Sequence, residues 1–377
     1  MKFIHTADWQ LGMTRHFLSG EAQARFSQAR LDAVRSIGQL AVKEECEFVV
    51  VCGDVFESNQ IDRQVLTRAF DAMSATPDVT FYLLPGNHDP LNAASIYTSN
   101  SFRRRRPANI VVLDGSEPVE VAAGVELLAA PWTSKRPLVD LVDRAAGLVG
   151  PSDVLRIAVG HGALDSRSPD ATNPALISLS GLEERIRNGE IHYVALGDRH
   201  STTEEGESGR IWYSGAPEPT RYDEIEPGNV LVVSLENDRL EVTPQTIGTW
   251  AFSEREWQVV SNGDIDGLEE WLSSFGHPER KIVKLSLVGQ LTVAQKARLD
   301  DLLELQAESF AALEHSELHT NLAVIADDAD FDDLDLSEVA RFALSDLRKQ
   351  ANSGNEAAAL AATDALALLH RLSEAAT

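Results

Sequence analysis

The sequence predicts an α/β fold for roughly its first 250 residues and a small α+β fold for the residues that follow. Over the first part, short apolar runs alternate with helix-like stretches, which is typical of α/β sheets. Unusual polar residues directly follow several of these runs, and the texture of the sequence changes after about residue 250. The 377 residues, 43% hydrophobic and 24% charged, have the composition of a globular protein with two or three domains.

Each predicted strand of the first part is a short apolar run bounded by polar or turn residues. These strands cover residues 2–6, 48–52, 79–84, 110–113, 125–129, 155–159, 192–196, 210–213 and 230–235. The predicted helices cover residues 23–44, 63–75, 137–149 and 174–187. In α/β sheets ligands bind beyond the carboxyl ends of the strands, so we expect a functional site where the polar residues follow the apolar runs.

The residues after 250 predict a small α+β domain and then further helices. Its expected strands are residues 256–260, 281–288 and 317–324, and its expected helices are 265–275 and 292–308. Residues 327–335 hold six aspartates and indicate a solvated linker. Amphipathic helices over 334–347 and 356–372 could dock on this chain or on a partner, and the acidic linker favours a partner. The expected domains are residues 1–250, 251–326 and 327–377.

The net charge of −26 argues against broad, non-specific binding to nucleic acid. About half of the excess negative charge falls after residue 250. A local exception is residues 103–106, four consecutive arginines after a helix-like segment. Three interpretations of this run remain open: a solvated helix end, a phosphate contact and a dimer contact. The dimer contact would make the protein a homodimer.

The cysteines, the lack of a long apolar run and the N-terminal residues predict a cytoplasmic protein. Cys46 and Cys52 are too far apart for a CxxC motif, and two buried thiols are the better interpretation than a disulfide. No apolar run approaches the roughly 18 residues of a membrane span. A signal peptide is not expected, because the first candidate functional residue is already Asp8.

Five short motifs follow predicted strands and contain the residues of metal chemistry. They are Asp8-Trp9-Gln10, Gly53-Asp54-Val55-Phe56-Glu57, Pro85-Gly86-Asn87-His88-Asp89, Gly160-His161 and Gly197-Asp198-Arg199-His200. One Asp or His at a strand end is usually a cap or turn residue, but five such motifs in order are hard to explain as turns. Carboxylates mixed with imidazoles suit a pair of divalent cations, such as manganese, that share a carboxylate and activate a water.

This order of motifs resembles the calcineurin-like metallophosphoesterases, whose pattern is D-x-H, G-D-x-x-(D/E), G-N-H-(D/E), G-H and G-H-x-H. Within that superfamily HTADWQLG, CGDVFE and LPGNHDP are similar to SbcD-type nucleases, closest to the YhaO-like branch of DNA repair exonucleases. WYSGAPEPTRYDE resembles the strand and turn that such nucleases carry after the last ligand. The resemblance covers residues 1–250 well and the later domains only in layout.

The resemblance implies a metallophosphoesterase β-sandwich flanked by helices that hydrolyses phosphodiester bonds of DNA as an exonuclease or endonuclease subunit. Residues 251–326 would form a small capping domain that binds DNA. The C-terminal helices would bind an SMC-like, SbcC-type ATPase. The expected cofactors are two divalent metal ions, with Mn²⁺ as the expected metal.

Carried over position by position, the resemblance also implies the metal ligands. Asp54 would bridge the two ions. The remaining ligands would be Asp8, Gln10 and His200 for one ion, and Asn87, His161 and Asp198 for the other. His88 would bind no metal but lie near the scissile phosphate, where it would protonate the leaving oxygen or stabilise the transition state. Asp89 would orient His88.

Two of these positions depart from the family pattern. Gln10 replaces the histidine of D-x-H, and Asp198 replaces the first histidine of G-H-x-H. Both can still offer an oxygen to a hard cation. Two alternatives therefore stay open beside the nuclease: a phosphodiesterase of cyclic or dinucleotides, and a weakly active scaffold that lends its tail to an ATPase.

Overall fold

The computed structural model describes residues 1–115, 117–170, 172–236, 239–316, 321–325 and 338–351, with positions 353, 358–359, 361–362, 364–366 and 368–369 beyond them. Its internal contacts divide the chain into unit 1, Met1–Ala251, and unit 2, Phe252–Thr377. Both units are mixtures of helices and strands, so the predicted α/β class is confirmed.

Unit 1 contains two six-stranded sheets. The first has the order β12-β11-β1-β2-β3-β4, in which β1 to β4 run parallel and β11 pairs antiparallel with β1 and β12. Its strands are β1 Lys2–Thr6, β2 Phe48–Cys52, β3 Thr80–Leu84, β4 Ile110–Val112, β11 Asn229–Glu236 and β12 Arg239–Thr246. The central strand β2 is buried along its whole length, as a strand covered on both faces must be.

The second sheet has the order β5-β6-β7-β8-β10-β9, with β6, β7, β8 and β10 parallel. Its strands are β5 Val119–Ala122, β6 Val125–Ala129, β7 Leu155–His161, β8 Tyr193–Gly197, β9 Thr203–Glu205 and β10 Ile211–Tyr213. In both sheets the central strands run parallel to one another. The carboxyl ends of several strands therefore lie at the same edge of each sheet.

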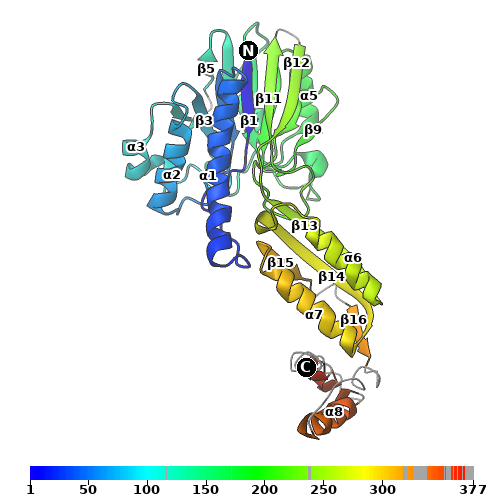
Figure 1. The fold of residues 1–377 in the computed structure, drawn as a ribbon. Helices are drawn as coiled ribbons and strands as arrows, with labels where there is room; N and C mark the ends of the chain where they lie inside the picture. The colour runs from blue at the N-terminus through cyan, green and yellow to red at the C-terminus, as the bar shows by residue number, and fades with distance from the viewer. Residues whose placement is uncertain are drawn as a thin grey trace. The chain divides into compact units, whose positions relative to one another are not determined.

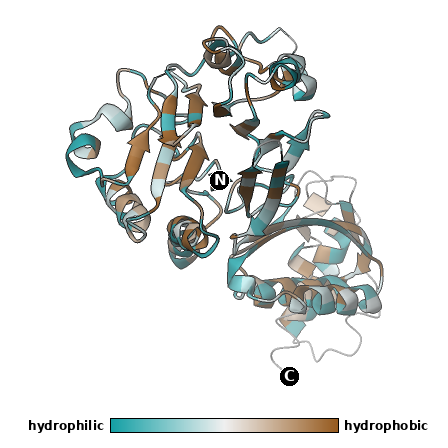
Figure 2. Cartoon of the chain, turned by 90° about the horizontal axis from the view of Figure 1, so that it is seen from above, coloured by the Kyte–Doolittle hydropathy of each residue, from teal (hydrophilic) through white to brown (hydrophobic). Residues whose placement is uncertain are grey.

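The two sheets pack face to face with helices outside both. One apolar cluster joins Phe3 and Val50 of the first sheet to Ile157 and Ala195 of the second. Helices α1 Gly20–Lys43, α2 Arg63–Ser74 and α3 Asn100–Arg105 lie on the outer side of the first sheet, and α4 Leu141–Ala146 and α5 Leu179–Arg187 on that of the second (Figure 1). The strands of unit 1 are mostly hydrophobic (Figure 2), and the predicted β-sandwich flanked by helices is confirmed.

Unit 2 is a second, smaller α+β structure. Its elements are β13 Ala251–Val259, α6 Asn262–Ser273, β14 Lys281–Thr292, α7 Val293–Ala307, β15 Ala312–His315, β16 Asn321–Ile325 and α8 Glu338–Ala351. Strand β14 lies between β13 and β15 and also pairs with β16. Thr292 and Gln295 form a capping box at the start of α7, close to the start predicted for the helix over 292–308.

Several elements differ from their predicted bounds for local reasons. The helix expected over 137–149 shortens to α4, because the Asp140 side chain caps the backbone amides of Val142 and Asp143. The helix expected over 174–187 begins only at Leu179, where Ser178 is the cap. Strands β5, β9, β12 and β15 were not predicted. Residues 327–335, and residues 356–357, 360, 363, 367 and 370–372 of the second predicted C-terminal helix, lie outside the described residues.

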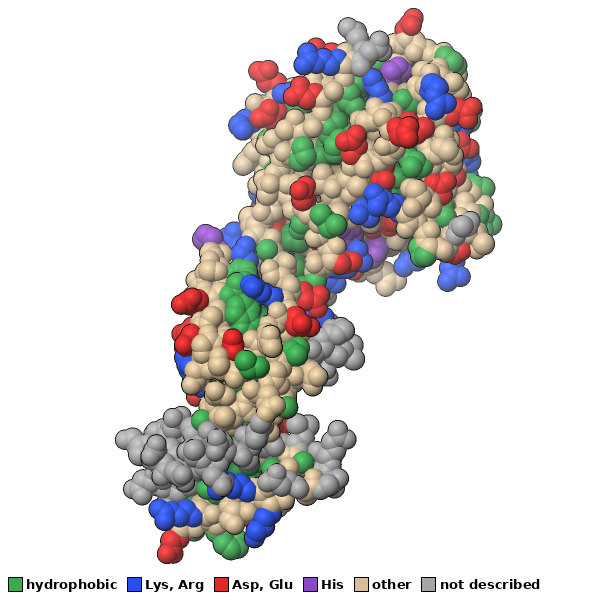
Figure 3. All heavy atoms as spheres, turned by 90° about the vertical axis from the view of Figure 1, so that its right-hand side faces the viewer, with side chains coloured by type: hydrophobic (Ala, Val, Ile, Leu, Met, Phe, Trp, Pro, Cys, Tyr) green, Lys and Arg blue, Asp and Glu red, His purple; other side chains and the backbone are tan. Residues whose placement is uncertain are grey.

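The cysteine prediction is confirmed, since Cys46 and Cys52 are both buried and free. In the part of the chain that the structure describes, no helix combines the length and apolar character needed to cross a membrane. On the face shown in Figure 3, acidic and basic side chains are interspersed over unit 1.

Candidate metal centre

The residues predicted to bind metal follow the carboxyl ends of five strands, three from the first sheet and two from the second. The segments after β1, β2 and β3 contain Asp8 and Gln10, Asp54, and Asn87, respectively. His161 is the last residue of β7, and Asp198 and His200 follow β8. The face-to-face packing of the sheets brings both sets of strand ends to one place.

The backbone turns sharply at four of these residues. Positive φ angles occur at Asp8 (54°), Gln10 (44°), Asp54 (52°) and Asp198 (93°), which are four of the seven non-glycine residues with positive φ in the described ranges. Such conformations cost free energy and persist where the surrounding structure enforces them, often at functional sites. Backbone hydrogen bonds from Asp8 N to Gly53 O (3.1 Å) and from Gln10 N to Asp54 O (2.9 Å) fasten the first two loops together.

Glycines leave the space that the candidate ligands occupy. A Cβ at Gly53 would lie 2.1 Å from His161 Nδ1, and a Cβ at Gly86 would lie 2.2 Å from Asp54 Oδ1. At Gly197 a Cβ would lie 1.9 Å from the Cys52 carbonyl oxygen. Any side chain at these positions would push a candidate ligand or its support out of place, so the glycines of the motifs are required for close packing.

Asp54 and His161 lie at the centre of the cluster of candidate ligands. One ligand atom from each of Asp8, Asp54 and His161 can be chosen so that all three lie within 4.8 Å of one another, and all three residues are buried. His161 Nε2 lies 3.4 Å from Asp54 Oδ2 and 3.7 Å from Asp198 Oδ1. The Asn87 amide lies 2.8 Å from His161 Nε2.

The Asn87 amide can present either of its polar atoms to Asp54. With its nitrogen turned inward it donates to the two carboxylate oxygens of Asp54 at 2.9 and 3.1 Å. A half-turn of the amide puts its oxygen in the same place, facing carboxylate oxygens. Two facing acceptors attract each other only when a cation lies between them, so this position suits a metal ligand.

The second group of candidate ligands gathers around His200. Its Nε2 lies 3.8 Å from Asp8 Oδ1 and 3.4 Å from the side-chain nitrogen of Gln10. The Gln10 side-chain oxygen is buried and accepts no hydrogen bond. Buried oxygens without a partner are rare and costly, and a bound cation would satisfy this one.

Hydrogen bonds to Nδ1 hold both histidines with Nε2 facing the cluster. His161 Nδ1 lies 2.8 Å from the Cys52 carbonyl oxygen, so it is the donor and leaves Nε2 as the free acceptor. His200 Nδ1 lies 2.6 Å from Thr220 Oγ1 and 3.0 Å from Glu224 Oε1. A hydrogen bond of this kind orients a histidine that ligates metal.

The charge balance of the cluster is negative. Burial raises the pKa of the Asp8 carboxyl to about 6, although His200 and His161 oppose this shift. Burial would lower the pKa of His161, but Asp54, Asp8 and Asp198 outweigh it and raise that pKa well above its usual value. Buried carboxylates that face one another favour a positive charge among them, so this donor set fits divalent cations.

His88 and Asp89 are placed differently from the expectation. Asp89 does not orient His88: its carboxylate accepts from Gly86 N (2.8 Å), Phe56 N (3.0 Å) and Tyr97 Oη (2.6 Å). The His88 ring is held instead by the main-chain oxygen of Glu57, 2.9 Å from Nδ1. The prediction was wrong because the buried Asp89 carboxylate satisfies backbone amides of this loop, whereas the His88 ring is partly exposed.

Three residues that support the candidate ligands were not predicted from the sequence. Glu224 and Thr220 hold His200, and the buried Arg30 donates to the carbonyl oxygens of Trp9 (3.2 Å) and Pro219 (3.1 Å). Arg30 thus ties the loop after β1 to the segment that carries Thr220. The only signal was the motif WYSGAPEPTRYDE, which contains Thr220 and Glu224 without revealing their partner.

A cavity of about 220 Å³ adjoins this group of residues. Its lining includes Asp198 and His200, together with Arg167, Arg199 and Arg221. Arginines beside a candidate metal centre suit an anionic group such as a phosphate, which their planar guanidinium groups can bind through two hydrogen bonds.

Comparison with known proteins gives consistent results. The sequence profile of the calcineurin-like phosphoesterases matches residues 1–233. The chain is 26% identical over 266 residues to the SbcD subunit of the SbcCD nuclease of Rhodobacter capsulatus, an alignment that spans 60% of this chain and 64% of that protein. The protein of the same name from Escherichia coli strain K12 is 24% identical over 277 residues, spanning 64% of this chain and 66% of the relative.

Solved structures were compared as well. A dimetal phosphatase from Danio rerio aligns with 65% of this chain and 96% of its own, at 14% identity and a TM-score of 0.41. The chain thus spans about two thirds of the length of the two nuclease subunits it matches, and nearly all of the zebrafish phosphatase matches part of this chain.

Proposed function

The chain belongs to the calcineurin-like phosphoesterase family, and from this premise we propose that unit 1 is a metal-dependent phosphodiesterase that cleaves DNA. The observation that supports this most strongly is the convergence of seven candidate ligands from five strand ends, with Gln10 offering a buried oxygen that has no other partner. Similarity to the two SbcCD nuclease subunits supports DNA as the substrate.

In this proposal Asp54 holds both metal ions. Asp8, Gln10 and His200 complete one position, and Asn87, His161 and Asp198 complete the other. When bound, the two ions would supply charge to offset the phosphate oxygens and would activate the attacking water. The chain's own part is to hold the donors rigidly, through the left-handed turns at the strand ends and the hydrogen bonds on the two imidazole rings.

His88 would act on the leaving group. Its backbone amide donates to Asp54 Oδ1 at 2.9 Å, and its Nδ1 donates to the Glu57 carbonyl oxygen. With Nδ1 as the donor, a neutral ring has no proton on Nε2, so His88 would act as the imidazolium, whose second proton on Nε2 would be available to the leaving oxygen of a bound phosphodiester. Asp89 would position His88 indirectly, because it fixes the loop from Gly86 onward.

The remaining parts of the chain would serve the same reaction. We propose that residues 251–326 form a DNA-binding cap and that the helices after residue 326 bind an SMC-like, SbcC-type ATPase, as part of a DNA repair complex of the cytoplasm. Helix α8 supports the second point, because Val339 and Phe342 are each 80% exposed. Its other side packs through Leu344 against Val293 of α7.

The test is hydrolysis of DNA by the purified protein in Mn²⁺. We expect turnover of a labelled DNA duplex or single strand that is lost in the Asp54→Asn variant. A small chromogenic phosphodiester is assayed in parallel. Turnover of the small substrate but not of DNA would point to the small-molecule phosphodiesterase, and no turnover of either would contradict the proposed enzyme.

The oxygen-rich ligand set predicts a preference for manganese over zinc. Gln10 and Asp198 offer oxygen where the family pattern has imidazole, and oxygen donors favour Mn²⁺, whereas zinc prefers nitrogen and sulfur. We expect the wild type to retain manganese after dialysis against mixed Mn²⁺ and Zn²⁺, and the double variant Gln10→His with Asp198→His to retain more zinc. Metal content by elemental analysis is the measurement, and two zinc ions with no manganese in the wild type would contradict the assignment.

The C-terminal helices predict a separable partner site. Deletion of residues 331–377 should leave the thermal unfolding of unit 1 unchanged and abolish co-purification with the ATPase, because amphipathic helices bury their apolar face in a partner. Val339→Glu with Phe342→Glu should have the same effect on binding, while the control Arg341→Glu, at an exposed position of the same helix, should not. A truncated protein that unfolds, or still binds the ATPase, would show that the tail belongs to the core.

A further inference from the structure

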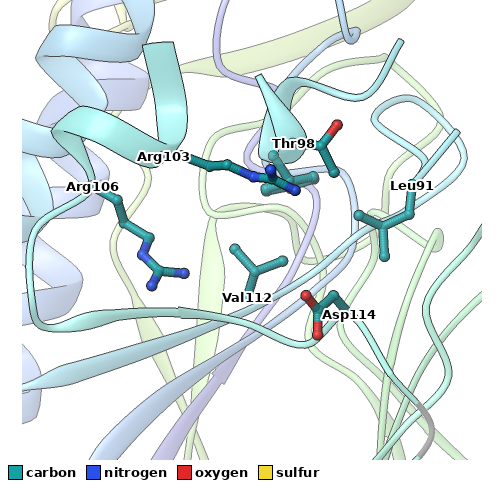
Figure 4. Close-up of a pocket in the computed structure, with 7 residues that line it drawn as sticks. Leu91, Thr98, Arg103, Arg106, Val112 and Asp114 are labelled. Carbon is teal, nitrogen blue, oxygen red and sulfur yellow. The ribbon is translucent and has the colours of Figure 1, made fainter. Parts of the chain in front are cut away.

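Arg103 and Arg106 line a cavity that is separate from the candidate metal centre. The cavity has a volume of about 270 Å³ and is lined by Leu91, Tyr97, Thr98, Arg103, Arg106, Val112 and Asp114. Both arginines reach into it from the end of α3, above Val112, and Asp114 lies on the other side (Figure 4). None of the seven candidate metal ligands lines it.

In the part of the chain that the structure describes, the two guanidinium groups have no internal partner. Within the described ranges, neither makes an ion pair or a side-chain hydrogen bond, although unit 1 is rich in carboxylates. Both side chains are exposed. Basic residues suit the last turn of a helix, but that preference does not require two of them to line the same cavity. Their placement fits an external anion.

A phosphate is the anion that this arrangement suits best. Guanidinium groups bind phosphate oxygens through paired hydrogen bonds, and both guanidinium groups line this cavity. At about 270 Å³ the cavity is slightly smaller than the roughly 300–1,000 Å³ usual for small-molecule pockets, so it has room for a single phosphate group and its immediate neighbours rather than for several nucleotides. Leu91 and Val112 are aliphatic, and the Tyr97 ring is 4% exposed and packs against Phe56 and Phe102, so the lining gives a free base little to stack on.

We propose that Arg103 and Arg106 hold a backbone phosphate of the DNA strand in this cavity, at a distance from the phosphate that is cleaved. The inference rests on the proposed nuclease function. The cavity is linked to the loop that follows β3, because Tyr97 lines it and donates from Oη to Asp89 at 2.6 Å. A strand held there lies beside the loop that carries Asn87 and His88, and in an acidic chain this local positive charge steers the strand to the correct side.

The chain offers a matched control for this site. Arg103→Gln with Arg106→Gln removes the two arginines that line the cavity, and Arg104→Gln with Arg105→Gln removes the same charge from the same helix without touching its lining. Affinity for a fluorescein-labelled DNA duplex or single strand is measured by anisotropy in EDTA, where cleavage does not interfere. Thermal unfolding of each variant confirms that the fold is kept.

We expect the cavity variant to bind DNA at least about tenfold more weakly and to reduce the magnitude of the slope of log affinity against log salt by about one, since one phosphate contact is lost. The control pair should stay within about twofold of wild type. Asp114→Asn, which removes a carboxylate from the wall, should instead tighten binding by roughly threefold. A gain of affinity cannot come from mere structural damage.

Three results would overturn the proposal. Equal losses in the two arginine pairs would mean diffuse attraction, and no loss in the cavity variant would mean that the site binds no strand. A mononucleotide that binds the cavity as tightly as the strand would make it a nucleotide site instead. Because binding is measured without turnover, a protein that binds DNA through Arg103 and Arg106 but cleaves none would refute the nuclease function and leave this site standing.

Discussion

An Asp54→Asn variant is expected to lose DNA hydrolysis by at least about 10³-fold and to retain less bound metal than wild type. Asp54 is buried and lies 3.4 Å from His161 Nε2, and its Oδ1 accepts from the backbone amide of His88. Burial opposes the charge on Asp54, but His161 and His88 outweigh that effect and lower the pKa of its carboxyl. An amide lacks this charge and has only one oxygen, so it cannot bridge two cations.

The fold of the Asp54→Asn variant should survive, because an amide oxygen can still accept from His88 N. The measurements are turnover of labelled DNA in Mn²⁺, metal content after dialysis, and the midpoint of thermal unfolding. Asp71→Asn, at an exposed position of α2, is the control for loss of one carboxylate and should match wild type in all three. Wild-type turnover and metal content in Asp54→Asn would refute the bridging role. If that variant unfolds, Asp8→Asn provides the same test from the neighbouring strand.

Much of the fold was accessible from local sequence pattern. Strand β2 is a continuous apolar run and β1 and β6 are short, largely buried segments, and the predicted bounds of all three agree with the structure. Strand β12 was missed because its exposed and half-buried residues alternate without an apolar run. The starts of α4 and α5 depend on the Asp140 and Ser178 side chains, so helix-like spacing alone placed them too early.

In the candidate site, too, the features set by local sequence could be predicted and those set by contacts between distant residues could not. That its candidate ligands lie close together could be predicted, because each stands in a short motif at or directly after a strand end, and parallel strands end together. Its supports could not, because they join residues far apart in sequence: Glu224 holds His200, and Tyr97 holds Asp89. Asp89 is an example of a partner that sequence adjacency does not predict. It is next to His88 in the chain, but its carboxylate accepts hydrogen bonds from the backbone amides of Gly86 and Phe56.

His88 gives the second large expected effect, and it should separate from metal binding. His88→Ser should lower turnover of DNA by roughly 10²–10⁴-fold, the usual range for a positioned acid. Metal content should stay near that of wild type, because the ring is held by the Glu57 main-chain oxygen and lies 3.9 Å from Asp54 Oδ2 without belonging to the ligand set. His277→Asn is the control, since His277 is 80% exposed in unit 2 and Asn tolerates its left-handed backbone.

The combination of readouts decides what His88 does. If the ring delivers a proton to the leaving oxygen, a DNA analogue whose leaving group needs no proton should restore most of the lost rate in His88→Ser but none in Asp54→Asn. A ring that only supported the loop would slow both substrates equally and lower the unfolding midpoint. Loss of both metals in His88→Ser would instead mean that the ring, held by the Glu57 main-chain oxygen, keeps the loop in place for its backbone amide to donate to Asp54 Oδ1, and the proton-transfer role would be wrong.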